Sequence, residues 1–214
     1  MVTLAEDLYL LASNGSTGRL LIDTAYLDVG LGGALLLDLT LRGHVGLTDS
    51  DVVGTTRSPI GDQLLDTALT TVVSEPKRHG PDHWVRRLGR GAHRAVQDHL
   101  RSTGVLRRDD DKLLHVIPVH RTHESDGRLH HDLQNHLNDA VVLGRPPSQE
   151  TAALASLVLA VGLERQLFPG WDRLEIRRRM ARIADGGWVA PAVAGAVTVL
   201  DVALGLVPEP EPLW

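Results

Sequence analysis

Apolar residues recur at the spacing of an amphipathic helix over most of the chain. Thr3-Leu4-Ala5-Glu6 fits a capping box, and Leu8, Leu11 and Ala12 then lie on one face of the helix that it would begin. Similar patterns predict a short helix around Trp84 and several longer ones. The longer helices are expected at about 28–41, 61–73, 91–102, 129–143, 149–168 and 173–184, with a last helix after Pro191.

Strand signals are few and short. Leu20 to Ile22 fits a short strand, and 44–47 with 52–55 predicts a small hairpin. A second hairpin is expected from 105–107 and 112–119, with its turn at Arg108-Asp109-Asp110-Asp111.

The balance of these signals sets the expected fold class. Leucine, valine and alanine dominate, and the aromatic residues are only 4 Trp, 2 Tyr and 1 Phe, which suits interlocking helices better than strands. We expect an all-α, mainly helical, compact single domain over residues 1–207. Amphipathic helices and one or two small β-hairpins would surround a central helix bundle, and 208–214 would form a Pro/Glu-rich extended tail.

Two apolar runs, 152–163 and 188–207, are candidates for membrane segments. The first is too short to span a bilayer, and the second contains Pro191, Asp201 and many Ala and Gly residues, so both are expected to be buried central helices. The N-terminus carries acidic residues where an export signal would be positively charged, and the chain has no cysteine. A cytoplasmic location is therefore expected.

Charge is distributed unevenly. The net charge is -5, which argues against a general nucleic-acid binder, so no nucleic-acid partner is expected. Between Lys77 and Arg108, however, nine Lys or Arg residues face only two acids, Asp82 and Asp98, which leaves 13 basic and 25 acidic residues elsewhere. One basic segment thus lies within an acidic chain.

Catalytic and metal-binding motifs are weak or missing, which argues against an enzyme. Gly30 and Gly32 fit the start of a dinucleotide-binding Gly-x-Gly-x-x-Gly, but Leu35 occupies the third glycine position, so close helix packing is the preferred interpretation. Six of the eleven histidines fall between His115 and His136, but they lack the spacing of metal ligands on one helical face. No catalytic motif of the common hydrolase, P-loop or zinc-protease types occurs, and neither a cofactor nor a metal is expected.

The basic segment 84–101 is the remaining candidate site. If Gly91 opens a helix, its free amide groups and its dipole would form an anion site beside Arg90, His93 and Arg94. An exposed basic face without a ligand explains the composition equally well. Since Trp84 is the only aromatic residue in the segment, a phosphorylated headgroup fits better than single-stranded nucleic acid.

Five motifs, in order, resemble those of the Golgi phosphoprotein 3 family from Thr3 to about Leu204. They are Thr3-Leu4-Ala5-Glu6-Asp7-Leu8-Tyr9-Leu10-Leu11, Gly30-Leu31-Gly32-Gly33 through Leu39-Thr40-Leu41-Arg42-Gly43, Gly61-Asp62-Gln63-Leu64-Leu65-Asp66-Thr67-Ala68-Leu69, Trp84-Val85 and Gly104-Val105-Leu106. The resemblance implies a mostly helical fold and a peripheral membrane protein that recognises phosphatidylinositol 4-phosphate. It also implies self-association through a protruding hairpin, here 112–121, with candidate residues Lys112, Leu114, Val116, Val119 and Arg121.

The resemblance also assigns the headgroup site. The first of the family's paired arginines matches Arg90, and the second falls on His93, with Arg94 beside it. The arginine of the family's Gly-Leu-Arg-Gly is Gly32 here, and the family's tryptophan falls on Asp23, whose carboxylate would repel a phosphate.

Our first hypothesis from the sequence is a peripheral membrane protein that binds an anionic, phosphoinositide-like headgroup. It would act at a membrane surface, and a homo-oligomer would raise its avidity. The alternatives are a DNA-binding protein that uses a helix and hairpin as a winged helix, and an interaction scaffold without a ligand.

Overall fold

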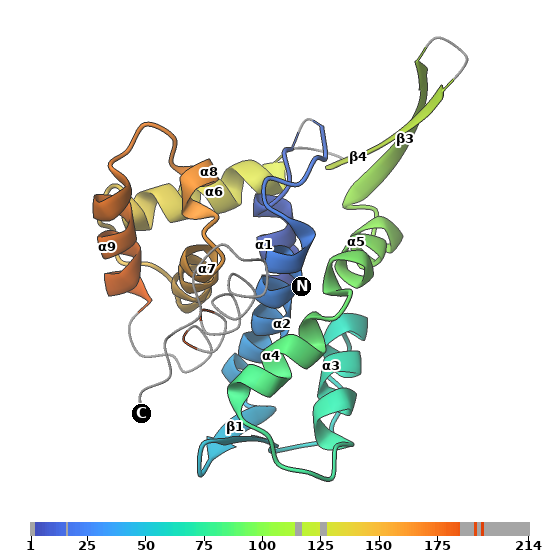
Figure 1. Ribbon diagram of the computed structural model, residues 1–214, viewed down its shortest axis with the longest axis vertical. Coiled ribbons are helices and arrows are strands. Elements are labelled where there is room, and N and C mark those ends of the chain that lie inside the picture. The colour runs from blue at the N-terminus through green and yellow to red at the C-terminus, as the bar shows by residue number, and fades with distance from the viewer. Residues whose placement is uncertain are drawn as a thin grey trace, which may run out of the picture.

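Two of the most apolar stretches of the chain, α1 (Leu4–Leu11) and α2 (Thr24–Leu41), form the centre of the computed structural model in Figure 1. The structure describes residues 3–15, 17–113, 117–124 and 128–184, with Pro191 and Ala194, and between 108 and 124 it describes the backbone. Helices predominate throughout this part of the chain, which confirms the all-α class. The expected helix after Pro191 and the tail 208–214 lie outside the described residues.

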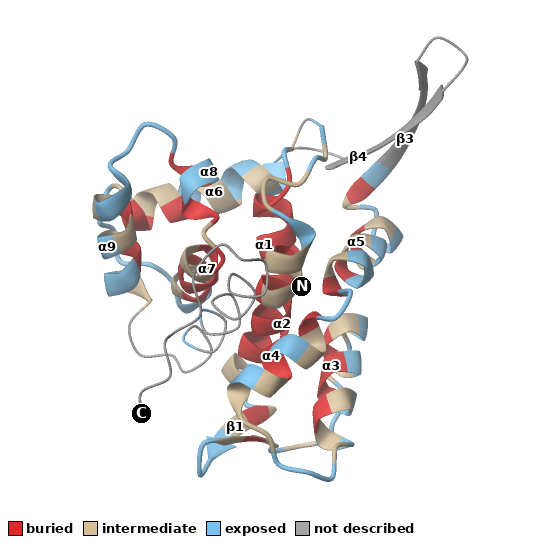
Figure 2. Cartoon of the chain, viewed as in Figure 1, coloured by how far each residue is buried: buried red, intermediate tan, exposed pale blue. Residues whose placement is uncertain are grey.

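The other helices lie on two sides of the central pair, which α3 to α7 contact directly (Figure 1). One side is formed by α3 (Gln63–Val73), α4 (Pro81–Gly89) and α5 (Ala92–Ser102). The other side is formed by α6 (Arg128–Val141), α7 (Gln149–Ala160), α8 (Glu164–Leu167) and α9 (Arg173–Ile183). Figure 2 shows the buried residues concentrated along α1, α2 and the faces turned toward them, so these two helices carry the core.

The start of α1 is built as the sequence predicts. The Thr3 hydroxyl accepts a hydrogen bond from the Glu6 amide, and Glu6 Oε2 accepts one from the Thr3 amide at 2.8 Å. Asp38 of α2 accepts a further bond from the Leu4 amide at 2.7 Å, which ties the two central helices together. Most of the orphan amides of this buried helix end are thus satisfied.

The start of α2 corrects two expectations. The helix begins at Thr24 rather than at about Asp28, because Asp23 caps it by accepting a bond from the Ala25 amide at 2.8 Å. Leu20 to Ile22 is not a strand; Leu20 forms only an isolated bridge with Ser13, and the chain then turns directly into α2.

Helix α2 is long and apolar enough to cross a membrane by length and composition, with a mean hydropathy of 1.3 over 18 residues. However, 61% of these residues are buried inside the protein, and α2 contacts helices on both sides. Burial on all faces is typical of a core helix, and it explains why α2 lacks an amphipathic pattern.

Both predicted hairpins are present, but the second has a different turn. Strands β1 (Val45–Thr48) and β2 (Asp51–Gly54) pair as expected. In the second hairpin, β3 (Leu106–Leu113) and β4 (Ile117–Glu124) are longer than predicted, so the proposed turn at 108–111 is wrong and these residues lie in β3. The antiparallel register continues through these residues, with Asp109 opposite Arg121, so the backbone pairs across the two strands here instead of turning.

The helix expected over 149–168 is interrupted. Helix α7 ends at Ala160, Gly162 adopts a left-handed conformation with φ of 72°, and the short α8 follows. Because only glycine adopts this conformation without strain, Gly162 ends the helix although the apolar pattern continues.

Candidate functional site

Four of the predicted headgroup residues, Gly32, Arg90, His93 and Arg94, lie where α2 packs against α4 and the start of α5, whereas Asp23 lies at the N-terminus of α2. Gly32 of α2 is buried against α4; a Cβ atom added to Gly32 would lie 2.1 Å from the carbonyl oxygen of Val85 and 2.6 Å from the amide nitrogen of Gly89. Gly89 is equally constrained, since its Cβ would lie 2.5 Å from the carbonyl oxygen of Asp28. These glycines therefore allow two helix backbones to lie in contact, in agreement with the close helix packing predicted for the glycine-rich stretch. Gly32 has no side chain that could bind a headgroup.

The start of α5 is bound by a carboxylate of the protein itself. Oδ1 of Asp28 accepts a hydrogen bond from the His93 amide at 2.7 Å and lies 2.8 Å from Nδ1 of the same residue. Asp28 thus takes the place at this helix end that the sequence pattern gave to a phosphate. His93 lies at the predicted site, but its amide and its ring both contact Asp28. The sequence predicted free amides at this helix start, and the His93 amide is not free.

Arg90 and Arg94 flank the same helix start on its solvent side. Arg90 is the last residue before Gly91, which turns the chain into α5 with φ of 71°, and Arg94 lies in the first turn of α5. Both side chains are exposed, and in the described part of the chain no carboxylate oxygen lies within 4.0 Å of either. By contrast, the neighbouring Arg87 pairs with Glu75 and lies over the Trp84 ring.

The comparison with protein families bears on this arrangement. The model of the Golgi phosphoprotein 3 (GPP34) family matches residues 4–200, which is nearly the whole chain. The chain belongs to the Golgi phosphoprotein 3 family. No curated protein matches the chain.

Within this family pattern, the two departures noted in the sequence now have structural explanations. Asp23, which the resemblance set at a tryptophan position, is the N-cap of α2 and is exposed. Gly32, which the resemblance set at an arginine position, is enclosed by α4, where a long side chain would have no room. Of the two positions matched to the family's paired arginines, Arg90 is exposed and His93 contacts Asp28, while Arg94, beside His93 in the sequence, is also exposed.

A cavity of about 580 Å³ lies beside Arg90 between α3, α4 and α5, and Arg94 is not among its lining residues. Arg90 and Arg87 line one part of it, and His99 and Asp98 line another. The remaining walls are mostly apolar, from Leu35, Leu64, Ala68, Leu88, Ala92, Ala95 and Val96. Its size is within the range typical of small-molecule sites.

The basic helix α9 is less available than its sequence indicates. Arg177 pairs with the buried Glu164 at 2.6 Å, and Arg179 pairs with Glu175 at 2.7 Å and donates to the carbonyl oxygen of Val142. Two of its arginines therefore hold α9 in place. Exposed Arg178 is without a carboxylate within 4.0 Å among the described residues.

The hairpin residues named for self-association are only partly described. Lys112 lies in β3, and Val119 and Arg121 lie in β4, while Leu114 and Val116 lie outside the described residues. Figure 1 shows β3 and β4 extending away from the helices, as the family resemblance implies.

Sequence reasoning did not identify Asp28. Its partner His93 is 65 positions away, and no local motif connects the two. The sequence gives only an indirect indication. A helix that begins after Gly91 has no Ser, Thr, Asp or Asn cap, so a hydrogen-bond acceptor for its first amides must come from another part of the chain.

Proposed function

We propose that this protein is a peripheral membrane protein that binds anionic phospholipid headgroups, with Arg90 and Arg94 as the phosphate-binding side chains. The observation that carries the proposal is that both arginines are exposed at the α4–α5 junction of a Golgi phosphoprotein 3 family chain, with no carboxylate partner among the residues that the structure describes. Guanidinium groups donate two parallel hydrogen bonds to phosphate oxygens, so a pair of free arginines suits this ligand. In this proposal the protein binds lipid and catalyses no reaction.

The position of Asp28 defines how the headgroup would be held. Since Asp28 already accepts the His93 amide, the phosphate would contact the arginine side chains rather than the helix amides. Each basic residue near an anionic surface contributes about 1 kcal/mol, so two arginines give weak and reversible attachment from the cytoplasm. Self-association through the β3–β4 hairpin would strengthen it by avidity.

The cavity beside Arg90 favours a lipid over a free phosphate metabolite. Its walls are mostly apolar, and Arg90 stands among its lining residues. A ligand with both a phosphate and an apolar part would use both features, whereas a small polar metabolite would leave the apolar walls uncovered. We therefore propose a phosphoinositide or a related anionic phospholipid as the ligand class.

Vesicle co-sedimentation of the full chain tests the proposal. We expect binding to phosphatidylcholine vesicles that contain phosphatidylinositol 4-phosphate or phosphatidylserine, and little binding to phosphatidylcholine alone. The double variant Arg90→Ala, Arg94→Ala should bind about 30-fold more weakly, because two contacts of about 1 kcal/mol each are removed. Undiminished binding of this variant would overturn the assignment.

One control tests whether another exposed arginine contributes to vesicle binding, and a second compares two anionic lipids. Arg178→Ala removes an equally exposed arginine from α9 and should leave binding unchanged. A preference for phosphatidylinositol 4-phosphate over phosphatidylserine would indicate headgroup recognition, and equal binding would indicate a general anionic surface. Binding of duplex DNA in place of vesicles would favour the winged-helix alternative and count against the proposal.

A further inference from the structure

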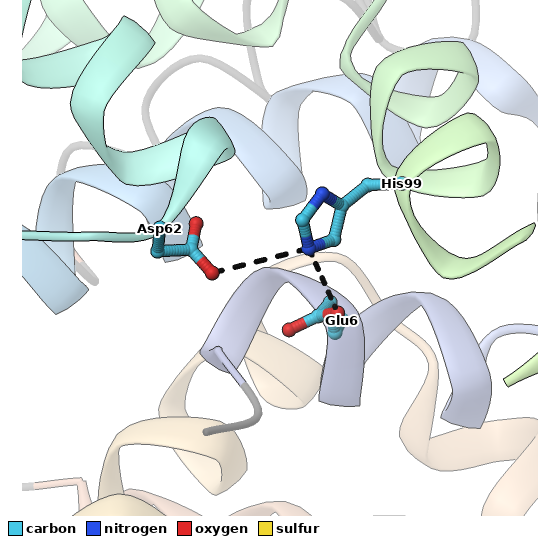
Figure 3. Close-up of side chains that lie close together, drawn as sticks. All are labelled: Glu6, Asp62 and His99. Carbon is cyan, nitrogen blue, oxygen red and sulfur yellow. Dashed lines mark ion pairs between the residues drawn. The ribbon is translucent and has the colours of Figure 1, made fainter. Parts of the chain in front are cut away.

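Three side chains from distant parts of the sequence converge beside the start of α1 (Figure 3). Glu6 belongs to α1, Asp62 precedes α3, and His99 lies in α5. Nε2 of His99 lies 3.6 Å from Oε1 of Glu6 and 3.9 Å from Oδ2 of Asp62. One ligand atom from each residue can thus face a common point, and these atoms all lie within 4.8 Å of one another.

Each carboxylate is fixed by its other oxygen. Oε2 of Glu6 accepts the Thr3 amide at 2.8 Å, and Oδ1 of Asp62 accepts the amides of Leu64 and Leu65 at 3.0 Å. Within the described residues, the two oxygens that face His99 accept no hydrogen bond. The helix caps therefore orient both carboxylates and leave one oxygen of each toward the imidazole, as outer-shell partners do in metal sites.

Two carboxylates meet a single imidazole at this point. The side chains are 6%, 18% and 14% exposed for Glu6, Asp62 and His99 respectively. Within the part of the chain that the structure describes, neither carboxylate has a Lys or Arg nitrogen within 4.0 Å. With a neutral imidazole, two poorly hydrated negative charges remain, and such charges require pairing or a metal ion.

We propose that Glu6, Asp62 and His99 bind a divalent transition-metal ion of the Zn²⁺ class. Imidazole nitrogen and carboxylate oxygen are normal zinc ligands, with bonds of about 2.0–2.2 Å, which place tetrahedral ligand atoms about 3.4 Å apart. The separations of 3.6 and 3.9 Å from His99 Nε2 are slightly longer than this, and the two carboxylate oxygens, which lie within 4.8 Å of each other, would close toward the ion as it binds. Two carboxylates and a neutral imidazole would balance the charge of the ion in full.

The number and type of ligands favour this class over Ca²⁺ or Mg²⁺. Ca²⁺ takes six to eight oxygen ligands and Mg²⁺ requires an octahedral set of oxygens, whereas three ligands that include an imidazole suit zinc and its neighbours. The fourth position would belong to water, because His99 also lines the cavity described above and the cavity gives an entry path. The ion would join α1, α3 and α5 at one point.

The test uses the full chain without a histidine tag, titrated with Zn²⁺ by calorimetry and with Co²⁺ by visible absorbance. We expect about one ion per chain and a rise in the thermal unfolding temperature with Zn²⁺. Glu6→Gln and Asp62→Asn are the sharpest variants, because the amide oxygen can keep each cap while the ligand oxygen is replaced by an amide nitrogen. Each, like His99→Gln, should weaken Zn²⁺ binding about 100-fold or more.

His93→Gln is the matched control, since His93 has only one carboxylate partner, and it should bind Zn²⁺ like the wild type. Far-UV circular dichroism shows which variants are folded, and any one folded variant of the three decides the result. Failure of the wild type to bind Zn²⁺ at one ion per chain, or equal binding by a folded variant, would overturn the proposal. So would nitrogen NMR that shows His99 protonated on both ring nitrogens while Zn²⁺ is bound, since the cluster would then be an ion-pair network only.

Discussion

Asp28 of α2 accepts the backbone amide of His93 at 2.7 Å and lies 2.8 Å from the ring nitrogen Nδ1 of the same residue. This one carboxylate joins α2 to the start of α5, which has no side-chain cap of its own. It also sets a negative charge at the helix end that would otherwise attract an anion. Asp28 should therefore stabilise the fold and oppose the proposed lipid binding.

Replacing Asp28 with Asn separates these two effects. We expect Asp28→Asn to bind anionic vesicles more tightly, by about fivefold, because one like charge near the phosphate is removed. The free energy of unfolding should fall by about 1 kcal/mol, since the charged partner of the α5 N-terminus is lost. Co-sedimentation and urea unfolding measure the two quantities.

Asp132→Asn serves as the control for Asp28, because it makes the same change in net charge at an exposed position on α6. Both its vesicle binding and its stability should stay close to those of the wild type. If Asp28→Asn bound vesicles no better than Asp132→Asn, the start of α5 would not be where the headgroup docks.

Asp7 predicts a pH dependence of stability. Burial, together with the nearby carboxylates of Glu6 and Asp38, raises the pKa of Asp7 from 3.8 to about 7. The folded state therefore binds this proton more tightly than the unfolded state does. The contribution of protonated Asp7 to the free energy of unfolding is fully present below about pH 4 and is lost as the pH rises toward 7.

The variant Asp7→Asn should therefore have a pH-dependent advantage. At pH 5 its free energy of unfolding should exceed that of the wild type by only about 1 to 2 kcal/mol, because pH 5 is little more than one unit above the pKa of the unfolded carboxyl. At pH 8 it should be higher by a few kcal/mol, because each tenfold difference in proton affinity between the folded and unfolded states corresponds to about 1.4 kcal/mol. Urea unfolding at both values measures the difference. An advantage that is the same at pH 5 and pH 8 would show that Asp7 titrates normally in the folded protein.

We predict that the chain self-associates through the apolar residues of the hairpin sequence. Leu114→Ser with Val116→Ser should shift the chain toward the monomer in sedimentation velocity and weaken vesicle binding through lost avidity. Leu143→Ser is the control, because Leu143 is a 61% exposed leucine outside the hairpin, two residues after the end of α6. If the double variant had the same sedimentation coefficient as the wild type at all concentrations, the hairpin would have no role in the proposed self-association.

Local features could be predicted from the sequence, and long-range ones could not. The Thr3–Glu6 capping box and the β1–β2 hairpin were predicted because their signals lie within a few residues. The Asp28–His93 contact was missed since its partners are 65 residues apart. Likewise, the Glu6, Asp62 and His99 cluster has no short spacing to reveal it, whereas the histidine-rich stretch, which is dense in sequence, gave the more visible metal signal.

The interface of α2 and α4 depends on Gly32, and the substitution Gly32→Ala tests it. Its Cβ atom would lie 2.1 Å from the Val85 carbonyl oxygen, and because this atom belongs to a helix backbone, α4 as a whole would have to move. We expect a loss of about 3 kcal/mol or more in the free energy of unfolding, at the upper end for overpacking. Gly46→Ala is the control, since its nearest contact is 3.9 Å from the Thr55 methyl, and it should change stability little. The same geometry predicts that Gly32→Arg, which introduces the family arginine, will unfold the chain rather than strengthen lipid binding; a folded variant with tighter vesicle binding would show instead that α4 can move away from α2.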